Sequence, residues 1–269
     1  GIHTTWEENH WCAELVSNWT LRHPEYWSCK RGALPWMGTC SIAYPEVVAH
    51  KLETLEERFA FGGDTIFLDL LRNGDWDPMR EYVKPVTDEW RRLYACEPPQ
   101  DWTDPRWLKL VGRHVNGYLR KFAAKCHERG VRFVLGIQRV KAGDDFAWAR
   151  EFAVDWKGLA KDGTLDGIVV MNVYPDWKDP WGSTRRIYED VMENRGKCDV
   201  YFHASMYDYR PGIPSYCKWT GETPAQVAKR LCDLAKEVGG KGVILECVDY
   251  GNYPSEVNEV LKAAGKEKR

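Results

Sequence analysis

The sequence lacks three features that would place the chain in a large functional class. No apolar run approaches the roughly 18 residues that a membrane-spanning helix needs, and no signal-peptide pattern precedes the first expected elements. The 38 basic and 40 acidic residues nearly cancel, so no strong overall field attracts nucleic acid or anionic lipid. We therefore expect neither a membrane span nor nucleic acid as a partner.

Two motifs with specific chemistry are also missing. The nine cysteines include no Cys-x-x-Cys pair, and an odd count leaves at least one thiol without a partner inside the chain. No glycine-rich phosphate loop follows any expected strand. Cys126, Cys232 and Cys247 lie in apolar periodic stretches that favour buried thiols, and the redox compartment stays open.

What is present describes a globular chain that is rich in tryptophan. Apolar residues make up 43% and charged residues 29% of the 269 positions, and a single (β/α) barrel of about 250 residues fits this length. There are 14 Trp, 13 Tyr and 8 Phe residues. They pack a core of large side chains, or they form platforms in a cleft where sugar faces or bases stack.

Short apolar runs alternate with amphipathic helical patterns along the chain. Each run is nearly continuous, as expected for strands covered on both faces. The five clear runs are Thr65–Leu70, Arg132–Ile137, Gly167–Val173, Val200–Met206 and Gly242–Val248, and Ile2–Trp6 is a sixth candidate. Such alternation requires a parallel sheet with right-handed crossovers.

The strand pattern predicts an α/β fold of the TIM-type (β/α) barrel, with a doubly wound open sheet as the alternative. A closed barrel requires eight strands, whereas six can be found. Either the early strands are cryptic, or the first two βα units of the parent fold are missing from this chain. We expect one domain over residues 1–269 whose sheet does not close, with a long insertion over the barrel mouth at about 73–106.

Polar and aromatic residues follow the expected strands, at the end where barrels carry their chemistry. The candidates for catalysis or substrate binding are Asp69, Arg72, Trp76, Gln138, Asn172, Asp176, Trp177, His203, Tyr207 and Glu246. Because parallel strands end at one rim, we expect these carboxylates, amides and rings to converge there.

Glycosidic bonds are cleaved by two carboxyl groups that flank the bond. Asp69 is the first candidate, as nucleophile or base, because it interrupts an apolar strand and needs a partner such as Arg72. Glu246 ends another apolar run and is the best second carboxyl. Asp176 is a third, as a general acid from a loop. The alternatives are a structural Asp69, a buried salt bridge of Glu246, and an exposed loop carboxylate at Asp176.

The remaining candidates fit sugar recognition. Gln138 and Asn172 both donate and accept hydrogen bonds and so suit hydroxyl groups. His203 either binds a hydroxyl or orients a carboxylate, or it is a core histidine with its hydrogen bonds satisfied. Trp76, Trp177 and Tyr207 are aromatic candidates for stacking, although simple packing explains any single ring equally well.

No cofactor or metal is expected. The N-terminal HTTWEENH segment offers His3, Glu7, Glu8 and His10, but its spacing is not that of a His-Glu-x-x-His zinc motif.

The runs HPEYW at 23–27, SIAYPEVV at 41–48, GGDTIFLDLLR at 62–72 and DPRWLKLVGRHVNGYLRKF at 104–122 occur in an informative order. Together they resemble the family-10 glycosylhydrolase-like barrel proteins. The resemblance implies a carbohydrate-active barrel, an oligo- or polysaccharide substrate, and a secreted or periplasmic location. It also implies that residues 1–10 correspond to roughly the third strand. The segment after Arg72 departs from the family pattern, which puts substrate detail in doubt.

Three hypotheses for function remain. The leading one is a hydrolase that cleaves glycosidic bonds with two carboxylates, with Asp69 central. The second is a non-catalytic glycan-binding barrel that keeps an aromatic cleft. The third is metal-assisted hydrolysis with His3, His10 or His203 as ligands. The sequence leaves the sugar, the linkage, the stereochemical outcome and the oligomeric state open.

Overall fold

The structure is a computed structural model, and the part of the chain it describes falls into two compact units. The described residues are 2–5, 16–69, 78–138, 154–171, 176, 178–207, 216–247, 259 and 262, with side chains for all but 2–5, 37, 138, 204–207 and 245–247. Unit 1 comprises Gly1–Leu135 and Phe146–Asp166, and unit 2 comprises Gly136–Asp145 and Gly167–Arg269.

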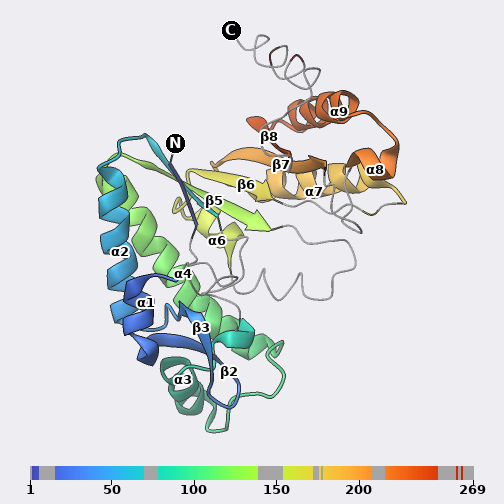
Figure 1. Cartoon of the computed structure of the whole chain (residues 1–269). Helices are drawn as coiled ribbons and strands as arrows, with labels where there is room; N and C mark the ends of the chain where they lie inside the picture. The colour runs from blue at the N-terminus through green and yellow to red at the C-terminus, as the bar shows by residue number, and fades with distance from the viewer. Residues whose placement is uncertain are drawn as a thin grey trace. The chain divides into compact units, whose positions relative to one another are not determined.

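Unit 1 holds the first strands and the longest helix (Figure 1). Its strands are β1 Ile2–Thr5, β2 Trp27–Lys30, β3 Leu34–Cys40 and β4 Thr65–Asp69, and β5 Arg132–Gln138 begins here. Its helices are α1 Asn18–Arg22, α2 Pro45–Phe59, α3 Lys84–Tyr94, α4 Pro105–Glu128 and α6 Trp156–Lys161, with 3-10 turns η2 Pro24–Tyr26 and η3 Pro78–Arg80. The helices α2 and α4 pack side by side.

The sequence sets the ends of α4 clearly. Asp104 caps its start by accepting the Arg106 N–H, and Pro105 occupies the first helical position. The helix ends before Gly130, whose φ of 67° lies in the left-handed region that glycine adopts without strain. The predicted apolar face is buried along the helix, and the Phe122 ring packs on Phe133 of β5 with centroids 5.0 Å apart. The helix therefore covers one face of the sheet.

A small antiparallel sheet of β2 and β3 precedes α2 in unit 1. None of the six apolar runs expected as strands lies in this segment. The strands are short, and the turn between them places Gly32 and Ala33 at positive φ, 86° and 56°. An alanine at positive φ is unusual, so the usual turn signal was missing.

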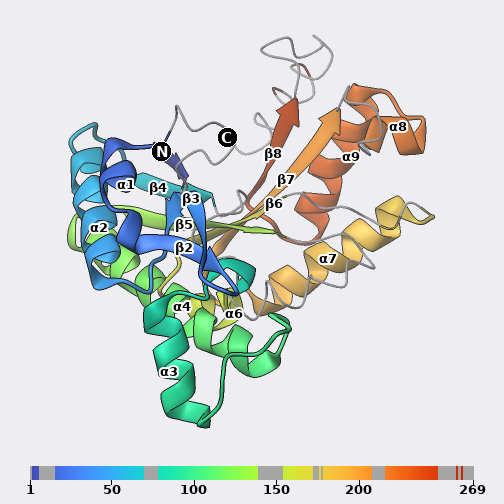
Figure 2. The ribbon, with the colours of Figure 1, turned by 60° about the horizontal axis from the view of Figure 1, so that its bottom comes forward.

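Unit 2 consists of three parallel strands with helices on them (Figure 2). The strands are β6 Gly167–Met171, β7 Asp199–Tyr207 and β8 Gly242–Cys247, and the helices are α7 Pro180–Asn194, α8 Tyr216–Thr220 and α9 Pro224–Glu237. Both neighbouring pairs, β6 with β7 and β7 with β8, are parallel. Thr223 and Gln226 fix the start of α9, because they form a reciprocal capping box.

The main sheet has six strands in the order β1-β4-β5-β6-β7-β8. This order follows the chain, as in a barrel, whereas a doubly wound sheet reverses direction part-way. The fold is thus an α/β fold of TIM-barrel type, as predicted. In the described strands β1 and β8 are the two ends of the order, so the sheet is not closed there.

Other organisational predictions fare differently. The predicted insertion at 73–106 contains η3 and α3 in its described part, and its place over a mouth stays a prediction, as does a single domain over 1–269. In the part of the chain described here, no helix is both long and apolar enough to cross a membrane. Cys126 is buried as expected, Cys232 is partly exposed, and the Cys247 side chain lies outside the described residues.

Candidate active site at the strand ends

Asp69 is the last residue of β4 and the best-described candidate in unit 1. Parallel pairing places it beside Thr5, the last residue of β1. Its side chain is only 5% exposed, after a strand in which Ile66 and Leu68 are buried. A carboxylate at that depth is stable only with polar contacts; Arg72, the partner we expected, lies outside the described residues.

His203 lies within β7 of unit 2 and is also 5% exposed. The register pairs it with Ile244 of β8, and two residues further on it pairs Ser205 with Glu246. Since strand residues alternate between faces, positions 203 and 205 and their partners 244 and 246 belong to the same face of the sheet. The sequence prediction that His203 and Glu246 belong to one site is therefore compatible with the backbone register.

The contacts of the intervening residues identify that face. Phe202, next to His203, stacks on Tyr188 of α7 with ring centroids 3.6 Å apart. Val243, next to Ile244, packs against the apolar cluster of Tyr216 and Leu231 on α8 and α9. Phe202 and Val243 thus face the helices of unit 2. Positions 203, 244 and 246 belong to the other face, which in a barrel is the interior.

Asp176 is exposed and belongs to the turn that leads into α7. Its Oδ1 accepts the backbone N–H of Lys178 at 3.0 Å, and its own N–H donates to Ser183 Oγ at 2.9 Å. These bonds give Asp176 a local turn-forming role. The general-acid role that we expected for it stays a prediction.

Several other predicted residues are not described in full. Arg72, Trp76, Asn172 and Trp177 lie outside the described residues, and for Gln138, Tyr207 and Glu246 the structure describes the backbone alone. The geometry of the proposed carboxyl pair is therefore untested. Trp181, in the first turn of α7, packs within the protein: its Nε1 donates to Glu222 at 2.9 Å and Arg230 lies over its ring at 4.4 Å.

Sequence reasoning missed a buried polar cluster in unit 1. Glu81 is buried, and its carboxylate accepts the Ser41 hydroxyl at 2.5 Å and the Ser28 hydroxyl at 3.5 Å. Beside it, Arg80 lies over the Trp36 ring at 4.1 Å. These contacts join η3 to the β2–β3 sheet and to the start of α2. The signal available in the sequence was Glu81 itself, a carboxylate close after Pro78 and Met79. Its partners, Ser28 and Ser41, are distant in sequence.

No group of three or more His, Cys, Asp or Glu side chains in the described part is arranged to hold a metal ion. The side chains of His3 and His10 lie outside that part. A metal-assisted reaction consequently gains no support from the residues that can be assessed.

Comparison with known proteins leaves the family open. No family model and no curated protein matches the chain. It is similar to the spore cortex-lytic enzyme SleL of Bacillus megaterium QM B1551, with 12% identity, 82% of this chain and 54% of that chain covered, and a TM-score of 0.47. It is also similar to Yersinia pestis DHPS, with 10% identity, coverages of 82% and 88%, and a TM-score of 0.35. The chain spans about half the length of the SleL chain, and the predicted family-10 resemblance stays a prediction.

Proposed function

We propose that this protein is a carbohydrate-active hydrolase that cleaves glycosidic bonds with two carboxylates, Asp69 and Glu246. The observation that carries the proposal is Asp69, a carboxylate only 5% exposed at the carboxyl end of a parallel strand. Apolar strands rarely end in a buried charge unless that charge has a task or a strong structural partner. Barrel enzymes place their reacting groups at this end of the strands.

The proposed roles follow from the chemistry of each group. Asp69 acts as nucleophile or base, and Glu246 acts as the second carboxyl from β8. His203, on the same sheet face as position 246, binds a sugar hydroxyl or orients that carboxylate. Asp176 is the reserve candidate for general acid, from the turn before α7.

Further substrate contacts are proposed from the predicted rim. Gln138 and Asn172 are assigned to hydroxyl groups, and Arg72 to Asp69 or to the substrate. Trp76, Trp177 and Tyr207 supply stacking surfaces. The substrate is an oligo- or polysaccharide, as the resemblance of the sequence to the family-10 glycosylhydrolase-like proteins implies.

The test is a hydrolysis screen on a panel of oligo- and polysaccharides, read as new reducing ends. Wild type is compared with Asp69→Asn, Glu246→Gln and a control, Asp64→Asn. Asp64 is an exposed carboxylate just before the amino end of β4, so the control makes the same change at the other end of the same strand. We expect activity losses of about 10²–10⁴-fold for Asp69→Asn and Glu246→Gln, and no loss for Asp64→Asn.

Equal activity in all four proteins would refute the assignment. If the wild type hydrolyses nothing on the panel but binds a glycan, the non-catalytic glycan-binding hypothesis is favoured instead. Melting curves of each variant separate a lost reaction from a lost fold.

A further inference from the structure

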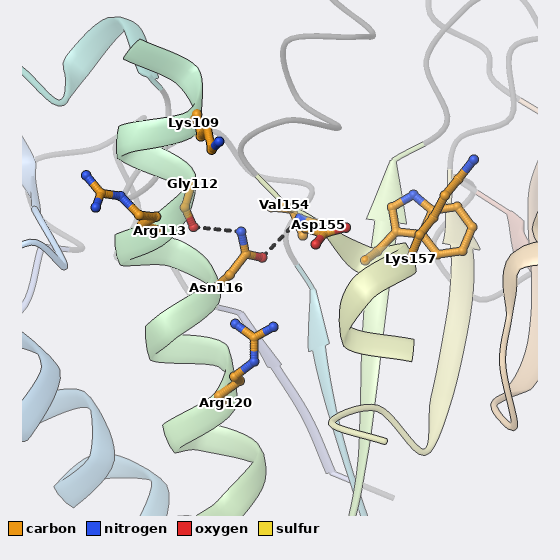
Figure 3. A pocket seen from close by; sticks show the side chains of 9 residues that line it. Lys109, Gly112, Arg113, Asn116, Arg120, Val154, Asp155 and Lys157 are labelled. Carbon is orange, nitrogen blue, oxygen red and sulfur yellow. Dashed lines mark hydrogen bonds between the residues drawn. The ribbon is translucent and has the colours of Figure 1, made fainter. Parts of the chain in front are cut away.

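A pocket of about 610 Å³ lies within unit 1, between α4 and the entry to α6. Figure 3 shows side chains of α4 on one side of it and the first residues of α6 on the other. Of the residues proposed for glycoside hydrolysis whose side chains are described, namely Asp69, Asp176 and His203, none lines this pocket. Its volume is that of a small-molecule site.

The lining of the pocket is strongly cationic. Among the described lining residues, Lys109, Arg113 and Arg120 of α4 and Lys157 of α6 are basic, and Asp155 is acidic. On α4 the cations sit at intervals of four and seven residues, so their backbone positions share one side of the helix. In Figure 3 the Arg113 side chain extends away from Asp155, and an ion pair joins it to Glu89.

The floor between the two helices is fixed by hydrogen bonds. Asn116 is buried; its Nδ2 donates to the Gly112 carbonyl at 2.6 Å and its Oδ1 accepts the Asp155 N–H at 3.0 Å (Figure 3). Trp156 beside it is also buried. The cationic side chains therefore project from a framework that is set before any ligand arrives, which lowers the entropic cost of binding.

The ion pairs of the lining arginines leave some of their N–H donors available to a ligand. Arg113 pairs with Glu89 at 3.1 Å, and Arg120 pairs with Asp162 at 3.0 Å. Glu89 and Asp162 are not lining residues. Each guanidinium has five N–H donors in a planar fork, and the Arg120 bonds use two of its nitrogens on a single oxygen. Within the described residues, Lys109 has no ion pair.

We propose that this pocket binds a small ligand that carries at least two anionic oxygen groups, phosphate or carboxylate. Arginine forks match such groups bidentately, and the flanking lysines supply point charges. The Asp155 carboxylate is the opposing negative charge among the described lining residues, and its Oδ1 accepts the Gly158 N–H at 2.9 Å. The site goes beyond the proposed hydrolysis and does not depend on it.

The experiment is calorimetric titration of the full chain with two probes, inorganic pyrophosphate and citrate, at low salt. The variants are Lys109→Gln and the double Lys109→Gln/Arg120→Gln. Their controls are Lys121→Gln and Lys121→Gln/Arg129→Gln. Lys121 is an exposed α4 residue that does not line the pocket, and Arg129, beyond the end of α4, is an exposed arginine paired with Glu56.

We expect wild type to bind at least one probe, and Lys109→Gln to weaken that binding by about tenfold. The double pocket variant should lose more, and both controls should stay within twofold of wild type. Preference for pyrophosphate or for citrate identifies the phosphate or carboxylate ligand. Failure of wild type to bind either probe, or equal weakening by Lys109→Gln and Lys121→Gln, would overturn the proposal.

Discussion

Two buried tyrosines in unit 2 are expected to respond differently to the same substitution. Phenylalanine should raise the free energy of unfolding at one position and lower it at the other. Tyr188 of α7 and Tyr216 of α8 are both almost completely buried. The Tyr216 hydroxyl is hydrogen-bonded to Thr184 Oγ1 at 2.7 Å. The Tyr188 hydroxyl has no hydrogen-bond partner among the described residues. Replacing either tyrosine by phenylalanine removes one buried hydroxyl oxygen from the interior of unit 2.

The expected magnitudes follow from the state of each hydroxyl. A buried hydroxyl without a partner costs about 1–3 kcal/mol, so Tyr188→Phe should raise the free energy of unfolding by roughly 0.5–2 kcal/mol once a small void is allowed for. Tyr216→Phe removes a satisfied bond and should lower the free energy of unfolding by about 0.5–1.5 kcal/mol. Thr184 keeps its other bond, to the Pro180 carbonyl at 2.7 Å.

The assay is urea unfolding followed by circular dichroism at pH 7, supported by calorimetric melting. A difference of 1 kcal/mol corresponds to about 2–4 °C in Tm for a chain of this size. Tyr188→Phe should therefore melt several degrees above Tyr216→Phe, with wild type between them. If Tyr188→Phe is as destabilising as Tyr216→Phe, the Tyr188 hydroxyl has a partner and the reasoning fails.

Alkaline pH supplies an independent check. Burial raises the pKa of both Tyr188 and Tyr216 above the ordinary value of 10. Above pH 10 the unfolded chain therefore loses these protons while the folded chain keeps them, and stability falls as pH rises. Each phenylalanine variant escapes its share of that fall. Relative to wild type, Tyr188→Phe should gain further above pH 10, and the deficit of Tyr216→Phe should shrink.

Two further predictions concern local packing and thiol chemistry. A Cβ on Gly240 would lie 2.5 Å from Cε2 of Phe202, so Gly240→Ala should destabilise by about 1–3 kcal/mol. Gly117 of α4 has open space at that position, so Gly117→Ala should instead stabilise by about 0.5–1 kcal/mol; urea midpoints that move in the same direction for both would contradict this. Burial raises the pKa of Cys126 to about 12, whereas Cys96 is exposed. Alkylation of the folded protein at pH 8, mapped by mass spectrometry, should therefore label Cys96 and spare Cys126. Comparable labelling of both cysteines would contradict this prediction.

The main strands were predictable because their sequences are nearly continuous apolar runs. The expected runs at 65–70 and 132–137 became β4 at Thr65–Asp69 and β5 at Arg132–Gln138. Strands covered on both faces need apolar residues at every position, so the signal is strong and bounded by glycine or charge. The β2–β3 sheet gave no such signal, because it is short and only partly buried.

The candidate site could be proposed from the sequence in position but not in detail. Barrel enzymes carry their chemistry at the strand ends, which selects Asp69 and Glu246 as candidates without any knowledge of contacts, and both stay predictions. Contacts between residues far apart in sequence leave no such local signal. The cluster around Glu81 shows the same limit: its two serine donors are 40 and 53 residues distant along the chain.

The pocket on α4 escaped sequence reading for a related reason. The sequence of α4 is that of an amphipathic helix, and the basic residues of such a helix are expected to face the solvent. Only the return of the chain to α6 adds Asp155 and Lys157 to the lining that Lys109 and Arg120 of α4 begin. A long-range contact, not a motif, makes the pocket.

The division of the chain into units has a consequence at the level of the gene. The chain leaves unit 1 after Leu135, returns at Phe146 and leaves again after Asp166. No single breakpoint, whether by recombination, truncation or proteolysis, separates unit 1 from unit 2 intact. A fragment that stops at Leu135 would lack α6 and with it one wall of the cationic pocket. Exchange of unit 1 alone between related genes would thus require three coordinated joins, after Leu135, before Phe146 and after Asp166.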